Sequence, residues 1–181
     1  MSKLLALLLL GAGLSAASPI VYSMDNPVGA GNISGTIETD GTIGTLSAVN
    51  IVDWNLVLND GSTTFTLQGP LSGNNSGLFL SGSDLTGTLT QLTFNFSGSS
   101  TVLFQSPAPG SGIDYFCLET DTTCTPSPAG EDLNIASGDQ FTPMSGVQVI
   151  AVDPVPEPST LGLLGLGTVA LALFRRKSIQ R

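Results

Sequence analysis

The clearest structural signal in the chain is the run WNLVLNDGSTTFTL, residues 54–67. Its centre, Asp60-Gly61, is typical of a two-residue hairpin turn of the primed type. With such a turn the expected pairs are Leu58 with Thr63, Leu56 with Phe65 and Trp54 with Leu67. These side chains share one face, and the other face is mostly polar, a division that a slip of one residue would destroy. The run therefore predicts an antiparallel β-hairpin with one buried face.

The same period of two recurs on both sides of this hairpin. Apolar and polar residues alternate over Ile33–Glu38 and over Leu92–Ser97. Clusters of Gly, Asn, Ser and Pro separate further expected strands, which are Gly77–Ser81, Leu85–Leu89, Thr101–Gln105, Ile113–Leu118 and Val147–Asp153. Many short strands with frequent turns are typical of an antiparallel β-sandwich or jelly roll. We therefore expect an all-β domain over residues 18–153.

Three local features qualify this pattern. Leu89 and Leu92 are out of phase, which predicts a bend or bulge near Thr90-Gln91. Residues 47–51 are expected to form one helical turn before Trp54, and residues 125–131 are expected to form a loop.

Charge is distributed unevenly along the chain. Five Lys and Arg stand against fourteen Asp and Glu, a formal net charge of −9, and there is no His. The five cations lie near the ends, whereas residues 18–153 carry thirteen carboxylates and no Lys or Arg. No salt bridge between side chains can form within that segment. A surface of this sign repels nucleic-acid phosphates, which bind through Lys and Arg, so the composition excludes nucleic-acid binding.

The same composition excludes most enzyme classes. A Ser or Cys nucleophile lacks its usual His base, and residues 18–153 hold no amine for a Schiff base and no guanidinium for a phosphate. Carboxylates remain, as in a glycosidase, which needs two of them across a sugar. The closest pairs in sequence are Glu119 with Asp121 and Glu131 with Asp132. We interpret them as solvated surface acids at strand ends, and we expect no catalytic residues.

Residues 1–17 have the organisation of a secretory signal peptide. Lys3 precedes an apolar run, Leu4–Leu14, and Ser15-Ala16-Ala17 supplies the small residues that a signal peptidase requires. A buried helix of a cytosolic protein is the alternative, but the run stands at the extreme N-terminus and has no polar face. We expect export, with cleavage after residue 17.

Residues 154–181 contain a second apolar stretch with polar flanks. The motif Pro156-Glu157-Pro158 precedes Thr160–Phe174, and the basic cluster Arg175-Arg176-Lys177 follows it. Fifteen helical residues span about 23 Å against a hydrocarbon core of about 30 Å, so the stretch predicts a marginal transmembrane helix over residues 160–174. The positive-inside rule holds the basic cluster in the cytoplasm and places the β-domain outside.

The order of a Pro-Glu-Pro motif, a short Gly-containing apolar helix and a basic end resembles the PEP-CTERM sorting signal of proteins from exopolysaccharide-producing bacteria. The resemblance covers residues 155–177. It implies that a membrane-embedded exosortase recognises the sorting motif, cuts near it, and passes the protein to the cell surface or the exopolysaccharide matrix. The motif residues are Pro156, Glu157, Pro158, Arg175, Arg176 and Lys177. A plain single-pass anchor with a Pro-rich linker is the alternative.

Two cysteines, Cys117 and Cys124, lie in the exported part, where thiols oxidise. A metal site would need more ligands than two Cys and no His supply, and a catalytic Cys has no base. We therefore predict a structural disulfide between them.

Two binding hypotheses remain open for the acidic body. Its carboxylates are ligands that Ca²⁺ prefers, although no EF-hand spacing is present. Trp54, Tyr22 and Tyr115 are candidates for a sugar-stacking platform, although the hairpin register places Trp54 with the core residues.

Two functions from different classes follow from these features. The first is a noncatalytic protein of the cell surface or extracellular matrix, sorted by exosortase. The second is a carbohydrate-binding or carbohydrate-active domain that acts on exopolysaccharide. Two carboxyls about 5 to 10 Å apart in a cleft beside an exposed aromatic side chain would favour the enzyme.

Overall fold

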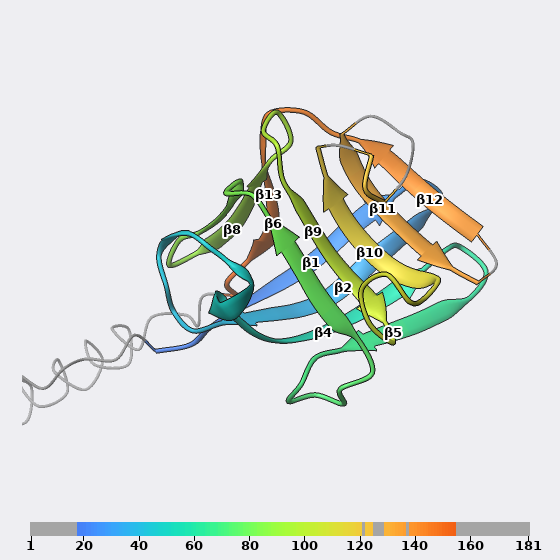
Figure 1. Cartoon of the computed structure of the whole chain (residues 1–181), viewed down its shortest axis with the longest axis horizontal. Coiled ribbons are helices and arrows are strands. Elements are labelled where there is room, and N and C mark those ends of the chain that lie inside the picture. Colours follow the sequence, from blue (N-terminus) through green and yellow to red (C-terminus); the bar gives the residue numbers. More distant parts are fainter. Residues whose placement is uncertain (1–17, 121, 125–128, 137, 155–181) are drawn as a thin grey trace, which may run out of the picture.

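The computed structural model describes residues 18–120, 122–124, 129–136 and 138–154, and these form two antiparallel β-sheets (Figure 1). The first, called the large sheet, has eight strands in the order β3 (Gly44–Thr45), β7 (Leu85–Gly87), β8 (Gln91–Asn95), β13 (Val147–Val152), β1 (Ile20–Val28), β2 (Gly31–Thr39), β4 (Ile51–Asn59), β5 (Thr64–Gln68). The second, called the small sheet, has the order β12 (Gly138–Pro143), β11 (Gly130–Ile135), β10 (Asp114–Glu119), β9 (Thr101–Ser106), β6 (Gly77–Ser81).

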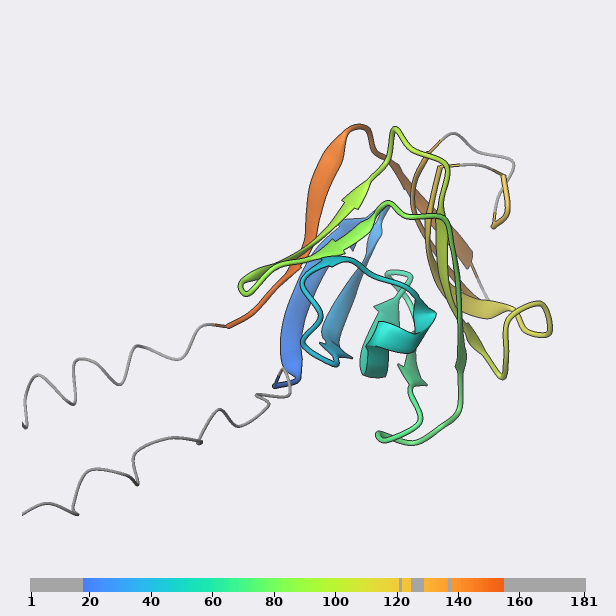
Figure 2. The same ribbon diagram turned by 60° about the vertical axis from the view of Figure 1, so that its left-hand side comes forward.

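The two sheets face each other as the layers of a β-sandwich (Figure 2), as the sequence predicts. Side chains from both inner faces fill the core. Trp54 from β4 meets Phe104 from β9 edge to face, with ring centroids 5.3 Å apart. The indole of Trp54 is 5% exposed and its N–H donates to the Ser76 hydroxyl at 2.8 Å. The prediction that Trp54 belongs to the core is confirmed.

The predicted hairpin exists, but its register differs by two residues. Leu58 pairs with Phe65 and Leu56 with Leu67, so residues 60–63 form a four-residue loop and the predicted two-residue turn is wrong. The Asp60 carboxylate explains the wider loop, because its Oδ1 accepts the backbone N–H groups of Ser62 and Thr63 at 2.8 and 2.7 Å. A shift by two preserves the faces, so Trp54, Leu56, Leu58 and Leu67 are still buried.

Replacing Asp60 with Ala should lower the free energy of unfolding by about 1–2 kcal/mol, because two backbone donors lose the acceptor that closes the loop. Asp60→Asn is the matched control, since it keeps a side-chain oxygen at the same place. Urea unfolding of the three proteins checks the prediction. Equal losses for the Ala and Asn variants would show that the charge, and not the acceptor geometry, holds the loop.

The other expected strands are present with small changes at their ends. The prediction for residues 77–81 coincides with β6, and β7, β9, β10 and β13 lie within two residues of their predicted ends. The helical turn expected at residues 47–51 is present as a 3-10 helix, Ala48–Asn50. The bend expected near Thr90-Gln91 is present, because the chain reverses there from β7 to β8 in a tight turn, with Thr88 N donating to the Gln91 carbonyl at 2.8 Å.

Four strands were not predicted. β1, β3 and β12 were passed over, and the expected loop at residues 125–131 is wrong where Gly130 and Glu131 begin β11. The predicted signal peptide, sorting motif and transmembrane helix lie outside the described residues. Within the part of the chain that the structure describes, no helix is long and apolar enough to cross a membrane.

Candidate functional site

The acids of the β-domain serve mainly as hydrogen-bond acceptors for loops. The domain has no Lys, Arg or His side chain, so backbone N–H groups take the place of cations. The backbone donors are Thr42 for Asp40, Leu71 for Asp53, Ser62 and Thr63 for Asp60, Ser99 for Asp84, Ala136 for Asp114, and Cys124 for Glu119. Hydrogen bonds from Thr42 hold the pKa of Asp40 below its ordinary value. These carboxylates are parts of the scaffold.

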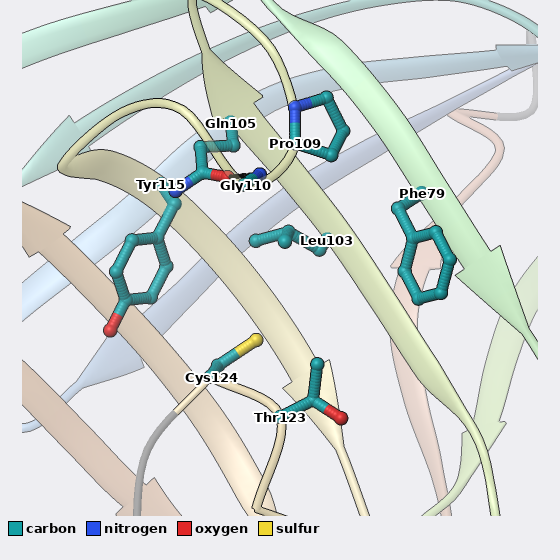
Figure 3. Close-up of a pocket in the computed structure, with 8 residues that line it drawn as sticks. All are labelled: Phe79, Leu103, Gln105, Pro109, Gly110, Tyr115, Thr123 and Cys124. Carbon is teal, nitrogen blue, oxygen red and sulfur yellow. Dashed lines mark hydrogen bonds between the residues drawn. The ribbon is translucent and has the colours of Figure 1, made fainter.

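A concavity of the described surface lies on the outer face of the small sheet (Figure 3). We call it the outer trough. It has a volume of about 380 Å³ and is lined by Phe79, Leu103, Gln105, Pro109, Gly110, Tyr115, Thr123 and Cys124. The register places the residues of its floor, because Leu103 on β9 pairs with Phe79 on β6 and with Cys117 on β10. Directly paired residues share a face, and this face points away from the core.

Two restrained loops border the outer trough. At one end Gln105 holds the 106–112 loop, because its amide donates to the Gly112 carbonyl at 2.7 Å and its oxygen accepts the Gly110 N–H. At the other end a disulfide joins Cys117 to Cys124, as predicted from the sequence. The trough is therefore held open by fixed contacts from both sides.

Figure 3 shows the rings of Phe79 and Tyr115 on opposite sides of Leu103. Phe79 is 43% exposed, which is unusual for a large aromatic residue in the middle of a strand. Of the three aromatic residues proposed from the sequence, Tyr115 lines the trough, whereas Trp54 and Tyr22 are buried in the core. Sequence reasoning missed Phe79; the signal was an apolar residue between Leu78 and Leu80, where strand alternation calls for a polar one.

A group of acids lies behind Tyr115. Its hydroxyl donates to Asp132 Oδ2 at 2.8 Å, and Asp132 is fully buried. Burial, and then the neighbouring Asp139 carboxyl, raise the pKa of Asp132, while burial and Asp132 raise the pKa of Tyr115. Glu119 is also fully buried. Neither Glu119 nor Asp132 can therefore reach a molecule in the outer trough.

The interpretation of the closest acid pairs as solvated surface groups is wrong for three of their members. Glu119, Glu131 and Asp132 are at most 1% exposed, and Asp121 lies outside the described residues. Glu131 and Asp132 are not a pair either, since Glu131 stands opposite Leu118 on the inner face and Asp132 opposite Cys117 on the outer face.

The side chain of Glu131, on β11 of the small sheet, faces a seam between two strands of the large sheet. There β1 and β13 pair only at Ser23 and Val152, and a pocket of about 340 Å³ opens between them. The Asn26 amide crosses this seam and donates to the Ile150 carbonyl and to Glu131 Oε1, each at 3.1 Å. Glu131 Oε2 has no hydrogen-bond partner among the described residues, and burial raises the pKa of Glu131 to about 7.

One group of three side chains has the spacing of a metal site within the described ranges. It consists of Glu119 with the sulfurs of Cys117 and Cys124. Those sulfurs are bonded to each other, so they supply no thiolates, and a single carboxylate is a poor set for Ca²⁺. Calcium binding remains a prediction from composition alone.

These features define an all-β domain with a disulfide and a surface trough. In a comparison with known families, residues 154–177 match the PEP-CTERM protein-sorting motif. The chain thus carries a PEP-CTERM sorting motif, which implies an exported protein that is processed at the membrane with exosortase as its sorting partner. No curated protein and no solved structure matches the chain.

Proposed function

We propose that the protein is a noncatalytic component of the cell surface or extracellular matrix, whose β-sandwich binds a ligand in the outer trough. One observation carries the proposal: the trough presents two aromatic side chains and no acid, and the nearest fully buried acids, Glu119 and Asp132, are closed off from it. A hydrolase would need carboxyls open to the ligand. Binding without chemistry is what the trough supports.

The route to that location follows from the two ends of the chain. In the proposed route, signal peptidase cuts after residue 17, the helix of residues 160–174 anchors the protein in the inner membrane, and exosortase then releases it. The β-domain suits the far side of that membrane, because its disulfide is stable in an oxidising compartment.

Replacing Pro156, Glu157 and Pro158 together with Ala should leave an uncleaved, membrane-bound form in a cell that has exosortase. The two prolines keep the motif extended just outside the bilayer, and the substitution removes that geometry. Ser159→Ala, directly after the motif, is the matched control and should be processed normally. Mass spectrometry of the intact protein from membrane and surface fractions measures the outcome. An unchanged mature mass in the triple variant would contradict the proposed recognition.

A second candidate is a carbohydrate-binding or carbohydrate-active domain that acts on exopolysaccharide. Aromatic rings that line the trough, exposed at Phe79 and half-buried at Tyr115, favour binding over hydrolysis. Incubation of the mature protein with purified exopolysaccharide distinguishes the two activities. Binding without new reducing ends supports the proposal, and the appearance of reducing ends would establish an enzyme.

A further inference from the structure

The shape of the outer trough suits an elongated group that reaches two aromatic rings. Phe79 on β6 is level with Leu103, whereas Tyr115 on β10 is level with Gln105, so their backbones lie about 12 Å apart across and along the sheet. Leu103, 9% exposed, forms the floor between them. Figure 3 shows Leu103 between the two rings. An elongated molecule with apolar faces would contact both rings at once.

The charges around the trough favour a ligand with a positive charge. No residue from 18 to 154 is Lys, Arg or His, so no side chain there can pair with an anionic group. Tyr115 donates its hydroxyl proton to Asp132, and Asp139 lies close enough to act on the same hydroxyl. A phenol that donates to a carboxyl group gains electron density in its ring, and an electron-rich ring face attracts cations.

From this combination we propose that the outer trough binds two neighbouring units of a glycan, at least one of them an aminohexose with its amine free and protonated. The proposal rests on the proposed function, since it names the ligand of the same site. The apolar face of one sugar ring lies on Phe79, and the ammonium group of the next unit lies over Tyr115, near the exposed acid Asp139. A glycan is favoured over a lysine side chain because two sugar units span the distance between the two aromatic rings, whereas a chain of four methylenes reaches only one.

Calorimetric titration with two glycans that differ only in charge tests the proposal. The probes are a glucosamine tetramer and an N-acetylglucosamine tetramer, added below neutral pH to the mature protein recovered from exporting cells. We expect the glucosamine tetramer to bind at least about tenfold more tightly, and raised salt to weaken it. Equal binding of both tetramers would overturn the cation proposal and leave carbohydrate binding intact. Binding of neither would overturn both, and equally tight binding of a lysine trimer would overturn the choice of a sugar.

Two substitutions distinguish binding in the outer trough from non-specific attraction of a cationic glycan to an acidic protein. Phe79→Ala should weaken the glucosamine tetramer about five- to tenfold, because it removes one of the two aromatic faces. Val21→Ala is the control, since Val21 on the opposite sheet is similarly exposed, at 41% against 43%. Circular dichroism of both variants confirms that they fold. Equal effects of the two substitutions would place the glycan elsewhere.

A second pair of variants tests the charge. Asp139→Asn and Asp25→Asn each remove one exposed acid, the first behind Tyr115 and the second on β1 of the other sheet. We expect only Asp139→Asn to weaken the glucosamine tetramer measurably, by about two- to threefold. The N-acetylated tetramer should not respond to either. Equal weakening by both variants would mean that net charge alone drives the binding and would overturn the proposal.

Discussion

Replacing Glu131 with Gln should remove part of the fall in stability that the wild-type domain shows as pH rises from about 4.5 to about 8, and the raised pKa of Asp132 accounts for the rest. At about pH 8 we expect the variant to be more stable than the wild type by about 1–3 kcal/mol. The gain is unusual for a change at a fully buried position, and its origin is the charge that the wild type must bury there.

The direction follows from the environment of the carboxyl. Burial raises the pKa of Glu131 from 4.5 to about 7, and its one described donor is Asn26. Between these values the folded protein keeps the proton while the unfolded chain has released it, so stability is full below about pH 4.5 and is lost as pH rises through 7. The shift corresponds to about 3 kcal/mol, and an unpaired Gln amide in the variant offsets part of it.

Urea unfolding of both proteins across this pH range measures the effect. Asp25→Asn is the control, because Asp25 is an exposed acid on β1 beside Asn26. It should leave the pH dependence unchanged. The raised pKa of Asp132 adds a dependence of the same sign, so some slope should persist in the Glu131 variant. A variant with the full wild-type slope would show that Glu131 is hydrated and ionised in the folded protein.

Carboxylates that cap loops change stability with pH in the opposite direction: they stabilise the folded domain when they are ionised. Asp40 has a lowered pKa because it accepts hydrogen bonds from Thr42 and Asn50, so its contribution is lost as pH falls. Together with Glu131 and Asp132, this places the stability maximum of the domain in the mildly acidic range. A domain without cations reaches such a maximum because its acids are either capped or kept protonated.

The fold was predictable wherever apolar and polar residues alternate without interruption. The hairpin of β4 and β5 has that pattern, and its faces were assigned correctly. β1 and β11 were missed because polar residues, Asn26 and Glu131, occupy inward positions and interrupt the alternation. The loop length at Asp60 was wrong because a side chain, and not the backbone preference of Asp-Gly, sets it.

The candidate site was only partly predictable. The sorting motif is a local pattern, and its family match covers the residues proposed for it. The outer trough depends on the side-by-side placement of β6, β9 and β10, which no local pattern reports. Tyr115 was named among three aromatic candidates, but sequence gave no means of separating it from the buried Trp54 and Tyr22. Burial of Glu119 likewise depends on the residues after β10, where Thr120 bonds to Ser100 and the disulfide holds Cys124 close to Glu119.

Removing that disulfide should lower the free energy of unfolding by about 2.5 kcal/mol, because the cross-link closes a short loop and restricts the unfolded chain. The loss has a second, native-state component. The Cys124 N–H donates to Glu119 Oε2 at 2.7 Å, so a loop freed from Cys117 would expose the Glu119 carboxylate to water. Thr123 and Cys124 also line the outer trough, so the glucosamine tetramer should bind more weakly to the same variant.

Two ways of removing the disulfide distinguish the effect of the cross-link on stability from the effect of the sulfur atoms. Reduction of the wild type removes only the S–S bond, whereas the double substitution Cys117→Ala and Cys124→Ala also removes two buried or half-buried sulfurs. We expect both to destabilise the domain, with the double variant lower by about 1 kcal/mol because of the cavity at Cys117. Guanidinium unfolding with and without reductant measures both. An unchanged unfolding curve after complete reduction, verified by thiol labelling, would mean that other contacts hold Cys124 over Glu119. The outer trough would then keep its shape in a reducing compartment.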